Sequence, residues 1–130
     1  MFKRFLILIG LVFLILSIPG SALAQDYFFQ LEREGVDVFF NEDGTTSIYY
    51  YLEFDNDPSG HPIEFVDLAL PNYSYNTGNI QAQINGEPVA YISSSEYQGS
   101  GSGVAIALGS RSIPPGQPGV VEVAISGIED

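Results

Sequence analysis

The fold is decided by residues 36–54, which read Val36-Asp37-Val38-Phe39-Phe40-Asn41-Glu42-Asp43-Gly44-Thr45-Thr46-Ser47-Ile48-Tyr49-Tyr50-Tyr51-Leu52-Glu53-Phe54. Two apolar runs flank a short polar turn. Successive side chains of a strand point to opposite faces, so each run can direct every second residue into a core. These inward residues are Val36, Val38 and Phe40 on the first run and Ile48, Tyr50, Leu52 and Phe54 on the second. The pattern predicts a β-hairpin, with Gly44 supplying the positive φ that a type I turn followed by a bulge requires.

Further strand candidates lie on both sides of this hairpin. They cover residues 27–33, 63–70, 80–84, 89–92, 104–108 and 120–126, and Glu34-Gly35 is expected to be a short break between the first of them and the hairpin. Asn85-Gly86 is a strong signal for a two-residue hairpin turn. The connections are the turn-rich residues 55–62, the ragged segment 73–78 and the Ser/Gly-rich residues 93–103, which we expect to be flexible. The proline-rich residues 114–119 exclude a helix before the last strand.

These elements predict an all-β protein of about seven to eight short strands. No window has a helical period, and the apolar residues are mostly β-branched or aromatic, which favours strands. We therefore expect an immunoglobulin-like β-sandwich after an N-terminal signal helix. A small closed barrel is the alternative architecture.

Residues 1–24 have the three parts of a secretory signal peptide. Lys3 and Arg4 precede an apolar run over residues 5–18, and Ala22-Leu23-Ala24 matches a cleavage site. We predict cleavage before Gln25. The alternative is an uncleaved membrane anchor, but the apolar run is shorter than the ~20 residues that a spanning helix needs. The chain is thus expected to be secreted or extracytoplasmic, at the cell surface.

The predicted mature chain, residues 25–130, is long enough for a single domain with its own core. It contains no second apolar stretch of spanning length and no cysteine. Sixteen acidic residues against two arginines leave it with a net charge of −14. Such a surface repels nucleic acid and anionic lipid, so neither is an expected partner.

The sequence has no complete motif for a common catalytic site. His61 is the one histidine and stands between Gly60 and Pro62, with no Gly-x-Ser-x-Gly motif elsewhere in the chain. A histidine zinc site lacks its ligands for the same reason. Paired carboxylates could serve a glycosidase, but among 16 acids such a pair indicates nothing without geometry. We therefore expect no enzymatic activity and no cofactor.

The most specific polar motif is Asp55-Asn56-Asp57-Pro58-Ser59-Gly60. It matches the first half of a calcium loop, with Asp55, Asp57 and Ser59 as candidate ligands. The twelfth position is Val66 where such a loop has glutamate, and no flanking helices are expected. The alternative is a connection between strands, in which Asp and Asn hydrogen-bond to their own backbone. We predict no tight calcium site here.

Tyrosines are the other candidate binding residues. Tyr49 and Tyr51 are expected on the hairpin face opposite Tyr50 and Leu52, and four more lie in or near loops: Tyr73, Tyr75, Tyr91 and Tyr97. Exposed tyrosines can stack on sugars or anchor a protein partner. They also commonly cover sheet edges with their hydroxyls in water, and single exposed aromatic groups need no functional explanation.

The signal peptide and several turn motifs together resemble the N-terminal extracytoplasmic β-sandwich regions of uncharacterised prokaryotic membrane-anchored proteins. The motifs are Val36-Asp37-Val38 before Asn41-Glu42-Asp43-Gly44-Thr45, Leu68-Ala69-Leu70-Pro71, Ile84-Asn85-Gly86-Glu87-Pro88 and Ile113-Pro114-Pro115-Gly116. The resemblance implies an ectodomain and assigns no functional residue. A C-terminal membrane helix is missing here, so the chain could be a complete domain or an N-terminal piece of a longer protein.

From the sequence we therefore predict an exported, non-catalytic structural or protein-interaction domain. The alternative is a carbohydrate-binding module that uses exposed tyrosines. The expected partner is accordingly a protein or a carbohydrate.

Overall fold

The structure is a computed structural model that describes residues 29–129, and its regular elements are almost all strands. The strands are β1 (Phe29–Phe40), β2 (Thr46–Asn56), β3 (Phe65–Ala69), β4 (Ile80–Ile84), β5 (Glu87–Pro88), β6 (Tyr91–Ser93), β7 (Gly103–Ala107) and β8 (Pro118–Ile128). Two three-residue 3₁₀ helices, η1 (Thr77–Asn79) and η2 (Gly109–Arg111), lie in connections. The prediction of an all-β fold is confirmed.

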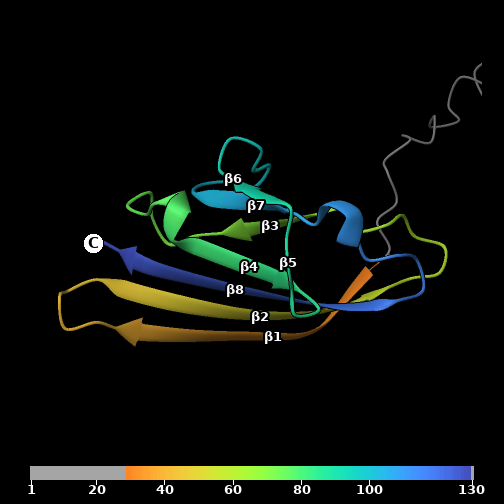
Figure 1. Ribbon diagram of the computed structural model, residues 1–130, viewed down its shortest axis with the longest axis horizontal. Coiled ribbons are helices and arrows are strands. Elements are labelled where there is room, and N and C mark those ends of the chain that lie inside the picture. The colour runs from red at the N-terminus through yellow and green to blue at the C-terminus, as the bar shows by residue number, and fades with distance from the viewer. Residues whose placement is uncertain (1–28, 130) are drawn as a thin grey trace, which may run out of the picture.

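The strands form two antiparallel sheets that lie one above the other (Figure 1). The larger sheet has the order β1-β2-β8-β4-β5, and the smaller sheet has the order β3-β7-β6. The last strand of the chain, β8, lies in the centre of the larger sheet between β2 and β4. Within residues 29–129, β1 forms one edge of the larger sheet and β3 forms one edge of the smaller sheet.

The β1–β2 hairpin forms as predicted, but Val36, Val38 and Phe40 do not enter the core and are 48%, 48% and 87% exposed. Val36 opposes Tyr50 and Val38 opposes Ile48, so the two apolar sets share one face. In the turn, Gly44 has φ 86° and its N–H donates to the carbonyl of Asn41 at 3.1 Å. The predicted turn at Asn85-Gly86 also forms, with both residues at positive φ.

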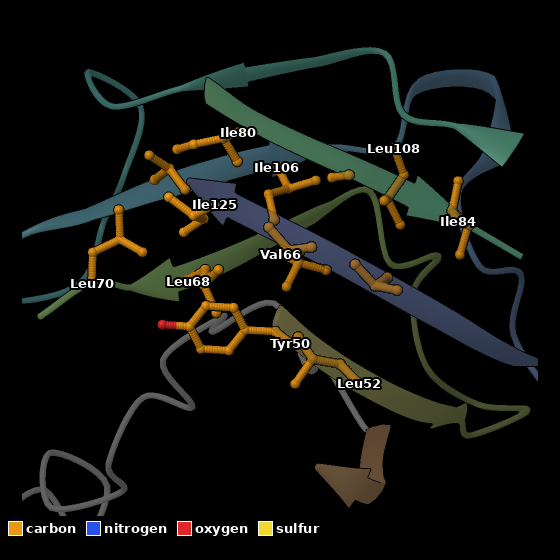
Figure 2. Packing of buried hydrophobic residues seen from close by; sticks show 14 of the residues in the cluster. Tyr50, Leu52, Val66, Leu68, Leu70, Ile80, Ile84, Ile106, Leu108 and Ile125 are labelled. Atoms are coloured by element: carbon orange, nitrogen blue, oxygen red, sulfur yellow. The ribbon is translucent and has the colours of Figure 1, made fainter. Parts of the chain in front are cut away.

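The core lies between the two sheets and takes side chains from β2, β4 and β8 on one side and from β3 and β7 on the other (Figure 2). Tyr50 and Leu52 are only 8% and 5% exposed, as the alternation predicted. Val104, Ile106, Val121 and Val123 are the most deeply buried strand residues. None of the twelve residues of β1 is buried.

The structure corrects the sequence prediction at β1. Residues 27–33 were expected to form a strand of their own that ends at Glu34-Gly35. Instead a single strand runs from Phe29 to Phe40, and a β-bulge between Leu31 and Arg33 takes the place of the break. A bulge absorbs one extra residue without ending the strand, which is why the alternation changes phase there.

A second correction concerns residues 89–92, which were expected to be one strand returning from β4. The chain instead changes sheets at Val89-Ala90, so that Glu87–Pro88 pair with β4 and Tyr91–Ser93 pair with β7. Pro88 cannot donate a ladder hydrogen bond, so it suits the end of such a short pairing.

The Ser/Gly-rich connection that follows makes specific contacts. The ring of Tyr97 lies against Gly99 and Gly103, leaving no room for a Cβ atom at either position, and the Ser102 hydroxyl donates to the Asn72 carbonyl at 2.6 Å. The glycines here make room for an aromatic ring.

The predicted signal peptide, residues 1–24, lies outside the described residues, as does Tyr27. Over residues 29–129, the structure has no helix with the length and apolar character required to cross a membrane.

Candidate functional site

The best candidate for a binding site is an uncovered flank of the molecule where β1 extends beyond the smaller sheet. Apart from Glu34, the inward side of β1 is apolar yet exposed, with Leu31 43%, Val36 48% and Val38 48% accessible. These residues lie on the same face as the buried Ile48, Tyr50 and Phe54 of β2. The alternation thus directs them toward a core that does not reach them.

This uncovered region contains a groove with a volume of about 1060 Å³ between β1–β2 and β3. We use the name open flank for this groove together with the adjoining exposed Val36 and Val38 of β1. The groove itself is lined by Phe29, Leu31, Glu34, Tyr50, Leu52, Phe54, Phe65, Val66, Asp67, Leu68, Ala69, Ser95, Glu96, Gln98 and Ala105. The Phe29 ring packs edge-to-face on Phe54, with 5.6 Å between the ring centroids. The groove therefore has an apolar floor built by the hairpin and one wall built by β3.

The charged groups of the open flank are all carboxylates. Glu34, Asp67 and Glu96 line it. Burial, and then the nearby negative charge of Glu34, raises the pKa of Tyr50, whose hydroxyl points out of the core cluster (Figure 2). The groove thus combines apolar surface with a negative potential, a combination suited to a ligand that is both apolar and cationic.

The outer face of the larger sheet holds the tyrosines that the sequence assigned to the opposite side of the hairpin. Tyr49 and Tyr51 are half-buried there, and Tyr51 lies opposite Gly35 and Glu122. The Tyr49 hydroxyl donates a 2.5 Å hydrogen bond to Glu122, which raises the pKa of this tyrosine. A shallow hollow of about 360 Å³ lies beside Tyr49 and is also lined by Phe39, Asn79 and Gln81.

The remaining tyrosines do not form one surface. Tyr73 and Tyr91 are 75% and 47% exposed, whereas Tyr75 and Tyr97 are half-buried and donate to the carbonyls of Gly103 and Ser100. The sequence analysis placed these four together only because they lie in or near loops.

The structure gives the calcium candidates different local roles. Asp57 accepts hydrogen bonds from the backbone N–H and the hydroxyl of Ser59 at 2.8 and 2.6 Å, and these bonds lower its pKa. Asp55 belongs to β2, where it pairs with Gln30 and Pro118. Within residues 29–129 no group of three or more acidic or histidine side chains is arranged to hold a metal ion. Through the two hydrogen bonds between them, Asp57 and Ser59 stabilise a turn in this connection.

Asn56, between those aspartates, is 1% exposed and joins two loops. Its Nδ2 donates to the carbonyls of His61 at 2.8 Å and Ile113 at 3.0 Å. Its backbone N–H donates to Gln117, and its carbonyl accepts from Gly116. In the calcium-loop pattern this residue stands at a position that is not a ligand, so the sequence did not indicate its structural role.

No protein-family model, curated protein or solved structure matches this chain. The sequence also missed the open flank, because Val36 and Val38 have the same alternation as core residues.

Proposed function

We propose that the protein is an exported, non-catalytic protein-interaction module that binds its partner at the open flank. The observation that supports this most directly is the apolar inward face of β1, whose side chains are about half exposed beside a groove of about 1060 Å³. An edge strand with unpaired backbone groups beside apolar pockets is the arrangement used by domains that bind extended peptides.

The proposal includes the cellular location and the finer architecture. We infer a cell-surface ectodomain, because the signal-peptide pattern and the turn motifs resemble such regions. We also infer an immunoglobulin-like arrangement of layers, supported by two antiparallel sheets of five and three strands. The order within the larger sheet differs from that of an immunoglobulin constant domain, since the last strand is central here.

The experiment is to select peptides from a random display library on the purified protein and to map the binding of the best one by NMR. We expect amide shifts to concentrate on β1 and on groove-lining residues of β3. Val38→Ser should weaken binding because it removes an exposed apolar contact, whereas Ala124→Ser on the outer face should not. Selected peptides whose shifts lie elsewhere on the surface would contradict the proposal.

Carbohydrate binding on the outer face is the second candidate function. Its support is the pair Tyr49 and Tyr51 at alternate positions of β2, beside Glu122 and the hollow of about 360 Å³. Aromatic faces with neighbouring hydrogen-bonding groups can stack on sugars. Titration with a panel of soluble oligosaccharides distinguishes the two functions. Saturable binding that is lost in Tyr51→Ala and kept in Val38→Ser would favour this second function.

A further inference from the structure

The β-bulge in β1 determines which charge enters the open flank. Before the bulge, Leu31 opposes the buried Phe54, and after it Glu34 opposes the buried Leu52. Opposed residues of neighbouring strands share a face, so Leu31 and Glu34 both point to the groove side. Arg33 opposes Glu53 and lies on the outer face. Without the extra residue, simple alternation from Leu31 would have directed Arg33 into the groove instead.

Glu34 is exposed, lies beside apolar residues of the groove and has no cationic partner among the described residues. It lines the groove together with Leu31, Tyr50 and Leu52. The one ion pair found within residues 29–129 joins Arg111 to Glu87 at 3.8 Å, on another part of the surface. A carboxylate in such a setting gains most from a ligand that brings its own positive charge.

We propose that the open flank binds an extended strand of a cationic partner protein, which adds to the free edge of β1 and places a Lys or Arg side chain opposite Glu34. Apolar side chains of the same strand, two residues away on either side, would contact Leu31 and Val36. This inference rests on the proposed interaction function and specifies the chemistry of its partner. It combines backbone pairing for affinity with alternate side chains for specificity.

Charge complementarity favours this occupant over a second copy of the chain. Asp67 and Glu96 add negative charge to the other wall of the groove. The predicted mature chain has a net charge of −14 and no lysine, so a second copy would bring its own excess of carboxylates to the same place. Like charges across an interface oppose association.

The edge of β1 is a better docking strand than the edge of β3. The connection between β6 and β7 reaches β3, where the Gln98 N–H donates to Asp67 Oδ2 at 3.3 Å and Glu96 lines the groove. A loop that covers an edge in this way limits its pairing with another chain. Among residues 29–129, β1 has no neighbour beyond it in the sheet order, and it is the longest strand there.

An inward-pointing charge on an edge strand can also have a protective role, because it discourages pairing between copies. The two roles of Glu34 predict opposite results. If Glu34 only protects, its neutralisation should cause self-association and leave peptide selectivity unchanged. If Glu34 recognises a cation, its neutralisation should remove selectivity and leave the protein monomeric.

The experiment uses short peptides that alternate valine with serine and differ only at one central apolar position, replaced by lysine, glutamate or glutamine. A fully N-methylated lysine peptide serves as a backbone control. Affinities are measured by calorimetry at low salt, binding is mapped by NMR, and the oligomeric state is followed by sedimentation. The proteins are the wild type, Glu34→Gln and Glu34→Lys. Asp37→Lys is the matched control, since it changes the same charge on the outer face of the same strand.

We expect the wild type to bind the lysine peptide about tenfold more tightly than the glutamate peptide. Glu34→Gln should abolish this preference and Glu34→Lys should reverse it, whereas Asp37→Lys should retain it. The N-methylated peptide should not bind, because it cannot pair with β1. Retention of the lysine preference in Glu34→Lys, binding of the N-methylated peptide, or dimerisation of Glu34→Gln would each overturn the inference.

The outcomes also separate this inference from the proposed function. If peptides bind at β1 without any preference for charge, the cationic partner is wrong and the interaction site stands. If no peptide perturbs any groove-lining residue, both are wrong.

Discussion

Replacing Asn56 by aspartate tests whether this buried amide holds the two loops together. The substitution keeps the side-chain shape but exchanges the Nδ2 donor for an oxygen. In the folded protein that oxygen faces the carbonyls of His61 and Ile113, at the places of two hydrogen bonds of 2.8 and 3.0 Å. The new carboxyl group is almost fully buried, since Asn56 is 1% exposed.

Asn56→Asp is expected to lose much of its unfolding free energy at neutral pH. Leaving a buried charge without a partner costs about 3–5 kcal/mol. For a domain of this size that corresponds to a fall of about 15–30 °C in melting temperature. Asn56→Ala should lose about 2–4 kcal/mol, because it leaves two buried carbonyls without donors but buries no charge.

The pH dependence identifies the cause. Burial raises the folded-state pKa of the new carboxyl group above its unfolded value. Below the unfolded pKa the carboxyl group is protonated in both states, so the cost of burying its charge is absent. This cost in unfolding free energy grows as pH rises, until the folded pKa is passed. The difference in unfolding free energy between Asn56→Asp and the wild type should become smaller from pH 7 to pH 4. Over the same range the difference for Asn56→Ala should stay constant.

Urea unfolding followed by circular dichroism measures these differences, with each variant compared with the wild type at the same pH. Asn41→Asp is the matched control: Nδ2 of Asn41 also donates two hydrogen bonds, to Thr45 and Ser47, but the site is exposed. It should cost less than about 1 kcal/mol. A loss in Asn56→Asp no larger than that of the control, or one independent of pH, would refute this account of Asn56.

Four further outcomes are expected. Leu52→Ala should cost about 2–5 kcal/mol because the side chain is 5% exposed, whereas Val36→Ala, on the same face but 48% exposed, should cost less than about 1 kcal/mol in urea unfolding. Added sodium chloride should raise the melting temperature, since it screens repulsion within a chain of net charge −14; a fall would indicate a fold held by ion pairs. Calorimetry should detect no calcium binding tighter than about 1 mM, and a micromolar isotherm lost in Asp55→Ala would contradict this. Mass spectrometry of exported protein should give a chain that starts at Gln25, and an intact Met1 would show that cleavage was wrongly predicted.

Local chemistry made much of the fold predictable. The turn residues Gly44 and Asn85-Gly86 adopt the positive φ angles that their sequence context indicated. The alternation of residues 48–54 correctly separated the buried Tyr50 and Leu52 from the half-buried Tyr49 and Tyr51. In each case the signal lies within a few residues of the feature that it predicts.

The open flank could not be predicted in the same way. Val36 and Val38 have the alternation of a core strand, and whether such residues are buried depends on how far the opposite sheet extends. That property belongs to the tertiary structure, because the strand pattern only states which residues share a face. The bulge that turns Glu34 inward is likewise defined by the register with β2.

The central place of β8 has a consequence for how the chain folds. The β1–β2 hairpin pairs residues close in sequence, whereas Tyr50 pairs with Val123 and Ala82 pairs with the same residue from the other side. Strands β2 and β4 therefore do not pair with each other, and both pair with a strand that comes later in the chain. A topology dominated by such distant pairings folds slowly. Before residues 121–125 pair with them, the hairpin and β4 expose unpaired strand edges and apolar faces. The chain is therefore most vulnerable to aggregation and proteolysis in the interval before β8 inserts.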